Sequence, residues 1–126
     1  MKNKFRNFIF ILFCMFVISK NGNANEPFIF DVTEIEILEN GEIINGYKGG
    51  TATALDGSIF KAENFFYNKS TNVLETTGDV IYFDKIKNLI IKTDKAIYFK
   101  NNEKIYTYGN SRVFSENNTI SSSNLE

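Results

Sequence analysis

Glu34 and Glu36 are the two residues whose spacing comes closest to that of a catalytic pair. Carboxylates two positions apart on one strand face lie about 7 Å from each other, which is within the range that inverting glycosidases use. Both glutamates alternate with Ile35 and Ile37, however, as solvent-exposed residues do on a half-buried strand. No nearby group that could shift a carboxyl pKa is visible in the sequence. We therefore interpret the pair as a polar stripe and not as a catalytic site.

Other residue types that perform catalysis or bind metals are scarce. The chain has no histidine, and its single cysteine, Cys14, lies in an apolar N-terminal run. This excludes Ser-His and Cys-His catalysis and the usual zinc sites. Four tyrosines could stack on bases or sugars, but on strands they more often pack across neighbouring strands; they are Tyr82, Tyr98, Tyr106 and Tyr108. We expect no enzymatic activity, no catalytic residue, no metal and no cofactor.

Residues 1–24 have the features of a secretory signal peptide. Basic residues precede an unbroken apolar run from Phe8 to Ile18, and small residues suited to cleavage end at Ala24. The apolar run is shorter than the roughly 20 residues that span a bilayer, so a retained anchor is the less favoured interpretation. Cleavage leaves one cysteine-free domain, residues 25–126, with ten basic and 15 acidic residues and a net charge of −5. That charge argues against nucleic acid as a partner.

The domain is organised around a repeat of 31 residues. The segment from Ile59 to Phe83 aligns without a gap with the segment from Ile90 to Phe114, including Gly78 with Gly109. A fainter copy begins at Glu34, and a fourth unit begins at Ile120, which leaves open whether the chain is a fragment. A period of this length indicates a stacked repeat architecture.

Each repeat reads as a strand, a tight polar turn and a second strand. Apolar residues alternate with polar ones, and Val, Ile, Thr, Phe and Tyr dominate, as is typical of half-buried strands. The mid-strand Gly78 and Gly109 predict a repeated bulge or bend that folds the sheet over its apolar face. The residues predicted to face inward are Phe60, Ala62, Phe66, Leu74, Thr76, Val80, Tyr82, Ile91, Thr93, Ile97, Ile105, Thr107, Ser111 and Val113. Asn64 and Lys95 share this inward parity, so either the strand bulges there or the position lies at a rim.

The repeats resemble the OstA-like family of lipopolysaccharide transport domains, which includes LptA and the N-terminal part of LptD. The matching residues are Ala62-Glu63, Tyr67, Asn72-Val73-Leu74 and Thr77-Gly78-Asp79-Val80, and then Thr93-Asp94, Tyr98 and Tyr108-Gly109-Asn110. The opening segment from Glu34 to Gly41 is most similar to an LptD-type start. The resemblance extends over about the whole domain from Phe28, and its specificity comes from the repetition of short motifs.

The resemblance implies an all-β fold, an open twisted antiparallel β-jellyroll, which holds the acyl chains of lipid A against the inward residues other than Ser111. It implies a periplasmic protein, associated with the outer membrane if it is LptD-type. Its partners would be lipopolysaccharide and other domains of the family, joined end to end by β-strand addition. The same residues are also compatible with a structural β-solenoid that has a solid core and no lipid. An enzyme that acts on surface glycans has the least support.

Overall fold

The computed structural model describes residues 26–126, so the expected signal peptide and Cys14 lie outside the described residues. The elements are β1 (Phe28–Leu38), a 3₁₀ turn η1 (Glu39–Gly41), β2 (Ile43–Ala54), β3 (Ile59–Ala62), β4 (Asn64–Asn68), β5 (Val73–Asp84), β6 (Leu89–Phe99), β7 (Lys104–Ser115) and β8 (Asn118–Leu125). All strands belong to one antiparallel sheet of eight strands, in which β3 and β4 lie in succession between β2 and β5. The predicted all-β antiparallel fold is confirmed.

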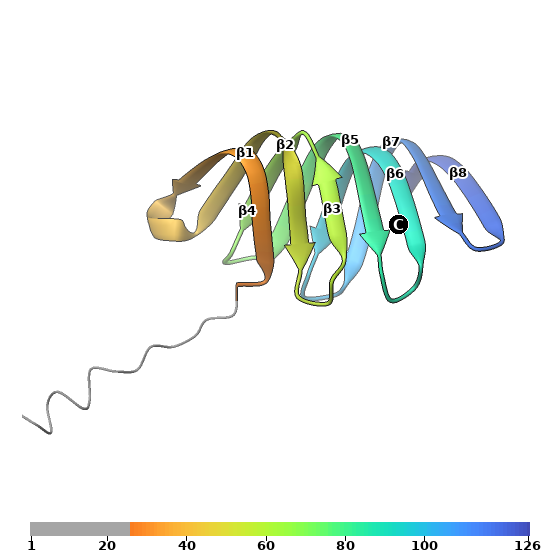
Figure 1. Cartoon of the computed structure of the whole chain (residues 1–126), viewed down its shortest axis with the longest axis horizontal. Helices are drawn as coiled ribbons and strands as arrows, with labels where there is room; N and C mark the ends of the chain where they lie inside the picture. Colours follow the sequence, from red (N-terminus) through yellow and green to blue (C-terminus); the bar gives the residue numbers. More distant parts are fainter. Residues whose placement is uncertain (1–25) are drawn as a thin grey trace, which may run out of the picture.

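The long strands are bent at bulges that contain the repeated glycines. Between Thr77 and Val80, β5 has one residue more than the facing stretch of β6, and β7 has one more between Tyr108 and Arg112. Gly78 and Gly109 take φ angles of 84° and 79° in these bulges, a region that glycine enters without steric cost. In Figure 1 the strands arch over along one side of the sheet, and most of the turns lie along the opposite side.

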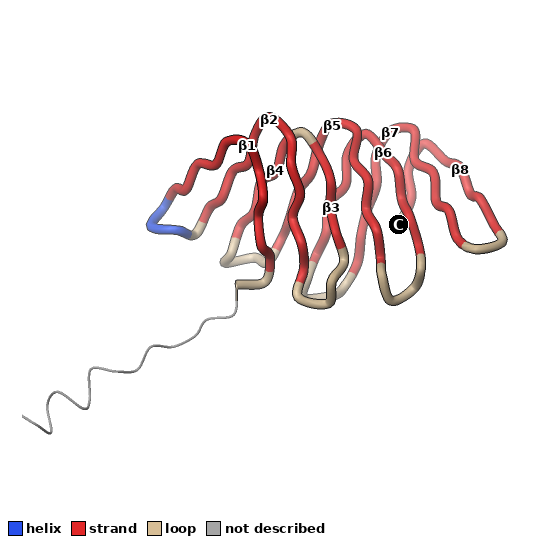
Figure 2. The backbone as a smooth tube through the Cα atoms, viewed as in Figure 1, coloured by secondary structure: helices blue, strands red, loops and turns tan. Residues whose placement is uncertain are grey.

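The bends divide the sheet into two arms that face each other. Arm A comprises residues 35–46, 64–77, 95–108 and 124–125, and arm B comprises residues 28–32, 50–62, 80–93 and 111–122. Each arm ends in a rim of turns, and one short loop at Glu63 separates β3 from β4 at the bend (Figure 2). There the amide of Glu63 donates to the carbonyl oxygens of Thr77 and Gly78 across the bulge.

Nine of the residues predicted to face inward as a lipid groove are buried: Phe60, Ala62, Leu74, Thr76, Val80, Tyr82, Ile91, Thr93 and Thr107. Ser111 is buried with them. Ile105 and Val113 are partly buried and pack against this core. These side chains fill the interior, which we define as the space between the inner faces of the two arms.

Phe66 and Ile97 were wrongly predicted to face inward. Phe66 is 43% exposed, and it pairs with Glu75, which in turn pairs with Ile97 in one outward-facing row. The irregularity at the bend reverses the alternation, so Phe65 and Ala96 face inward in their place. This also accounts for Asn64 and Lys95: the alternation reverses just before them, at Glu63 and Asp94 opposite the bulges, and both belong to the outer face.

Candidate functional site

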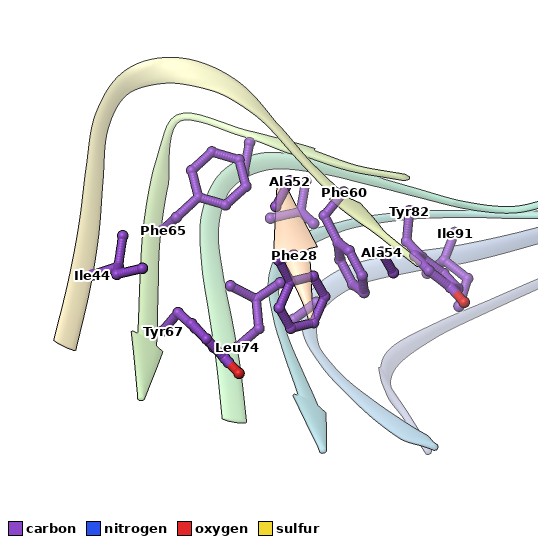
Figure 3. Packing of buried hydrophobic residues seen from close by; sticks show 13 residues of the cluster. Phe28, Ile44, Ala52, Ala54, Phe60, Phe65, Tyr67, Leu74, Tyr82 and Ile91 are labelled. Atoms are coloured by element: carbon purple, nitrogen blue, oxygen red, sulfur yellow. The ribbon is translucent and has the colours of Figure 1, made fainter. Parts of the chain in front are cut away.

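The interior of the N-terminal half is filled by aromatic side chains that reach from one arm to the other (Figure 3). Phe28 of arm B lies edge-on to Tyr67 of arm A, with ring centroids 5.1 Å apart. Phe60 of arm B lies 5.3 Å from Tyr98 of arm A. Such pairs contribute about 0.5–1.5 kcal/mol each beyond the burial of their area. The two arms are therefore joined by the bend on one side and by side-chain packing within the interior.

Two tyrosines of this aromatic cluster place their hydroxyl groups near the rims, where each hydroxyl forms a hydrogen bond. The Tyr67 hydroxyl donates to Asn72 Oδ1 over 2.9 Å, and the Tyr82 hydroxyl donates to Asp84 Oδ2 over 3.4 Å. The rings are buried while the hydroxyls reach polar partners. Burial raises the pKa of Tyr67 and that of Tyr82 to about 12.

These two tyrosines predict alkaline destabilisation. In the unfolded chain a tyrosine loses its proton near pH 10, whereas the buried rings of Tyr67 and Tyr82 keep theirs until about pH 12. The stability that they contribute is complete below pH 10 and is lost as the pH rises toward 12, on the order of 2 kcal/mol per tyrosine. Urea denaturation at pH 8 and at pH 11.5 measures this loss. Tyr82→Phe should reduce it, and an equal loss in the variant and the parent would contradict the assignment.

A hydroxyl cluster occupies the interior of the third repeat close to the bend. Ser111 Oγ lies 2.9 Å from Thr93 Oγ1 and accepts from Thr107 Oγ1 over 2.7 Å. Thr93 Oγ1 also donates to the carbonyl oxygen of Gly109 over 3.1 Å. Thr76 Oγ1 donates to the carbonyl oxygen of Ala96. These groups satisfy one another and the bulged backbone, so they stabilise the bend.

The interior is open at both ends of the sheet. Next to the edge strand β8, Ile105 and Val113 are only partly buried, and Ile120, which pairs with Val113, is 56% exposed. At the other edge, Ile35 and Ile37 pair with the buried Gly46 and Ile44, so they belong to the inner face, yet both are exposed. Apolar inner surface therefore continues to each edge without a covering strand.

The candidate carboxylate pair lies on the outer face of β1. Glu34 forms an ion pair with Lys48 at 3.3 Å, and Glu36 accepts from Asn45 Nδ2 and the Tyr47 hydroxyl at 3.2 Å each. All of these contacts are exposed. The pair thus forms part of a polar cross-strand network, as its alternation with Ile35 and Ile37 indicated.

The four tyrosines of the sequence analysis separate into two groups. Tyr82 and Tyr98 belong to the interior packing, whereas Tyr106 and Tyr108 lie on the outer face of arm A, where Tyr108 pairs with Lys95. The sequence reasoning missed the interior roles of Phe28, Phe65 and Tyr98. Asn64 and Lys95 are polar residues at positions where the alternation predicted an inward side chain. This mismatch could have revealed the interior positions of Phe65 and Tyr98.

Searches against protein-family models, curated proteins and solved structures give no match to the chain. Within residues 26–126, no group of three or more histidine, cysteine, aspartate or glutamate side chains is arranged to hold a metal ion. No helix in this part of the chain is long and apolar enough to cross a membrane.

Proposed function

We propose that the chain is a non-enzymatic, exported lipid-carrying module that holds the acyl chains of lipopolysaccharide between arms A and B. The observation that carries this proposal is a single bent sheet with an apolar inner face that is left uncovered at its edges. Ile105, Val113 and Ile120 provide the uncovered lining beside β8. The resemblance of the repeats to the OstA-like family, with its open β-jellyroll, adds the identity of the lipid.

The energy of hydrocarbon burial is large enough for this role. Removing one methylene from water contributes about 0.8 kcal/mol, so an acyl chain of about ten methylenes contributes about 8 kcal/mol. Separating the two arms in the filled N-terminal half would break the aromatic pairs between them, which contribute about 0.5–1.5 kcal/mol each. An acyl chain therefore enters with least cost beside β8 and displaces the aromatic pairs of Phe28 and Phe60 only afterwards.

The edge strands favour end-to-end partners. β1 and β8 each pair with one neighbour and leave a row of backbone groups available, which invites another strand to add. Ile37 at one edge and Ile120 at the other would continue the apolar lining into the added domain. The partner of this kind is another domain with the same bent sheet, in the periplasm or at the outer membrane.

A structural β-solenoid module with a solid core is the second candidate. It is favoured by the N-terminal half of the interior, where Phe60 is 1% exposed and Leu74 is fully buried. In this alternative the interior takes no lipid and only the outer face and the edges bind partners.

Photo-crosslinking distinguishes the two candidates. A photoreactive residue at Ile105 or at Val113 should capture lipopolysaccharide, because both side chains line the open end of the interior. The matched controls are Phe66 and Ile97, which face outward from arm A. Capture several-fold above these controls supports the carrier, whereas equal or no capture at Ile105 and Val113 rejects it in favour of the solid core.

A further inference from the structure

The two rims of the molecule differ in chemistry. Two neighbouring turns on the arm B rim each present an aliphatic side chain at the tip: Leu55, which is 60% exposed, and Ile86, which is 75% exposed. Lys85 and Lys87 flank Ile86. The two repeat turns on the arm A rim consist of polar residues only, at 69–72 and 100–103. Exposed aliphatic tips at the repeat turns are therefore confined to the arm B rim, while on the arm A rim Leu38 at the end of β1 is 42% exposed.

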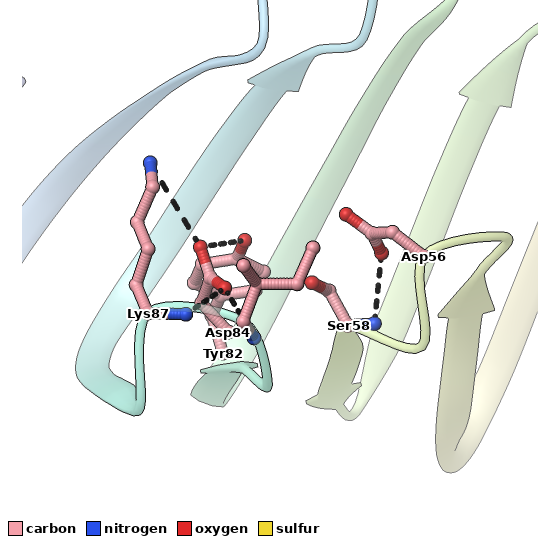
Figure 4. Close-up of polar contacts among 6 residues, drawn as sticks. Asp56, Ser58, Tyr82, Asp84 and Lys87 are labelled. Carbon is pink, nitrogen blue, oxygen red and sulfur yellow. Dashed lines mark hydrogen bonds and ion pairs between the residues drawn. The ribbon is translucent and has the colours of Figure 1, made fainter.

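Hydrogen bonds fix these tips in place (Figure 4). Asp56 Oδ1 accepts from the Ser58 amide over 2.8 Å. Asp84 Oδ1 accepts from the amides of Ile86 and Lys87 over 3.0 and 2.9 Å. The two turns also lie side by side, because a Cβ on Gly57 would be 3.5 Å from Lys85 Cδ. Each aliphatic side chain is thus held outward and does not fold back onto the core.

The outer face of arm B also carries apolar and basic side chains, which form two rows that run across the strands. The row nearest the rim is mostly apolar and contains Ile29, Ile59, Phe83, Ile90 and Phe114. Two residues farther from the rim, the next row contains Lys61, Lys92 and Arg112, with Asp31 at its β1 end. Two strand residues correspond to about 7 Å. Lys92 Nζ connects the rows, 5.6 Å from the centre of the Phe114 ring.

We infer that the arm B rim and its outer face bind the surface of an anionic phospholipid membrane. Amphipathic helices that bind at a membrane surface place their apolar face about 5–10 Å into the boundary between headgroups and acyl chains, and we take the same depth for this rim. With Leu55, Ile86 and the apolar row at that depth, the cations about 7 Å higher lie at the level of the lipid phosphates. Lysine and arginine near an anionic membrane surface are attracted to its negative potential.

β1 begins at the arm B rim, where Phe28 pairs with Ala54 next to the Leu55 turn. Two residues earlier, Glu26 forms an ion pair with Lys69 of the arm A rim over 2.9 Å, so the start of the described chain contacts that rim as well. The inference concerns only the outer face and the turns, so it does not depend on lipid uptake in the interior.

A local fluorescence probe tests the inference on the full chain. In a Cys14→Ser background, Ile86→Cys carries a polarity-sensitive nitrobenzoxadiazole label, and Asn101→Cys on the arm A rim carries the matched control. Vesicles of phosphatidylglycerol and phosphatidylcholine, without lipopolysaccharide, should give a blue shift and at least a twofold rise in emission at position 86. Position 101 and vesicles of phosphatidylcholine alone should give little change.

A charge variant and a second labelling site complete the test. Replacing Lys61, Lys92 and Arg112 by glutamate should raise at least tenfold the vesicle concentration that gives half of the maximal signal at position 86. The far-UV circular dichroism spectrum should be unchanged. Leu55→Cys replaces the first labelling site if Ile86→Cys alters that spectrum. Equal responses on the two rims, no response on the arm B rim, or indifference to phosphatidylglycerol would each overturn the inference.

Discussion

Phe60→Ala is expected to lower the free energy of unfolding by about 3–5 kcal/mol, the range for removing a fully buried phenylalanine. Phe60 is 1% exposed, and its ring lies 4.6 Å from that of Tyr82 and 5.3 Å from that of Tyr98. Alanine leaves a cavity between the two arms, at the centre of the packing that joins them. Urea denaturation monitored by circular dichroism measures the loss.

Ile59→Ala is the matched control for this prediction. Ile59 precedes Phe60 in the same strand, but it is 37% exposed and belongs to the outer row of arm B. We expect its replacement to cost less than about 1 kcal/mol, as is usual for partly exposed surface positions. A loss in Phe60→Ala no greater than that in Ile59→Ala would show that the aromatic cluster does not hold the arms together.

The same variant also bears on the proposed function. A large cavity lined by apolar side chains accepts apolar ligands. If acyl chains enter the interior, lipopolysaccharide should raise the melting temperature of Phe60→Ala more than that of the parent protein. A solid-core module would show no such difference, because the lipid would have no path to the cavity.

Gly50→Ala is expected to destabilise the protein by at least about 3 kcal/mol, because the added Cβ has no space. Gly50 takes a φ of 152°, and a Cβ there would overlap the carbonyl oxygen of Asp31 and lie 2.6 Å from Val32 Cα. Both neighbours are backbone atoms of β1, so neither can turn aside. Relief requires β1 to separate from β2, which would remove Phe28 from the interior. Denaturation midpoints and amide exchange of β1 measure the effect.

Gly49→Ala separates steric overlap from backbone conformation. Gly49 also has a positive φ, 86°, but a Cβ there would meet nothing within 4 Å. Its replacement should cost about 1 kcal/mol, the conformational penalty alone. Similar losses in the two alanine variants would contradict the close approach of β1 to Gly50.

Much of the fold follows from the repeat. The gapless match of the two long segments, the alternation of apolar residues and the recurring glycines predicted hairpins in one antiparallel sheet, and the structure has that sheet. Gly78 and Gly109 lie at the bulges, as their mid-strand positions indicated. These features are local, because turn residues and strand alternation depend on neighbours a few positions away.

The inward assignments of Phe66 and Ile97 failed at the same bend that the glycines marked. Alternation has a period of two, so one irregular residue moves every later side chain to the opposite face. The reversal lies opposite each bulge, at Glu63 and Asp94. Their side chains meet the Gly78 and Gly109 positions from across the strands. The sequence indicated a bend but not which strand would change its parity.

By itself, the sequence determined the strands, the turns and the period at which they stack, because each of these depends on short-range patterns. The tertiary structure decided which aromatics meet across the interior, such as Phe28 with Tyr67. It also decided that the exposed tips Leu55 and Ile86 lie on the same arm as the basic outer row of Lys61, Lys92 and Arg112. These arrangements join residues from different repeats, and their positions depend on how far the bulges turn each strand, which no local pattern specifies.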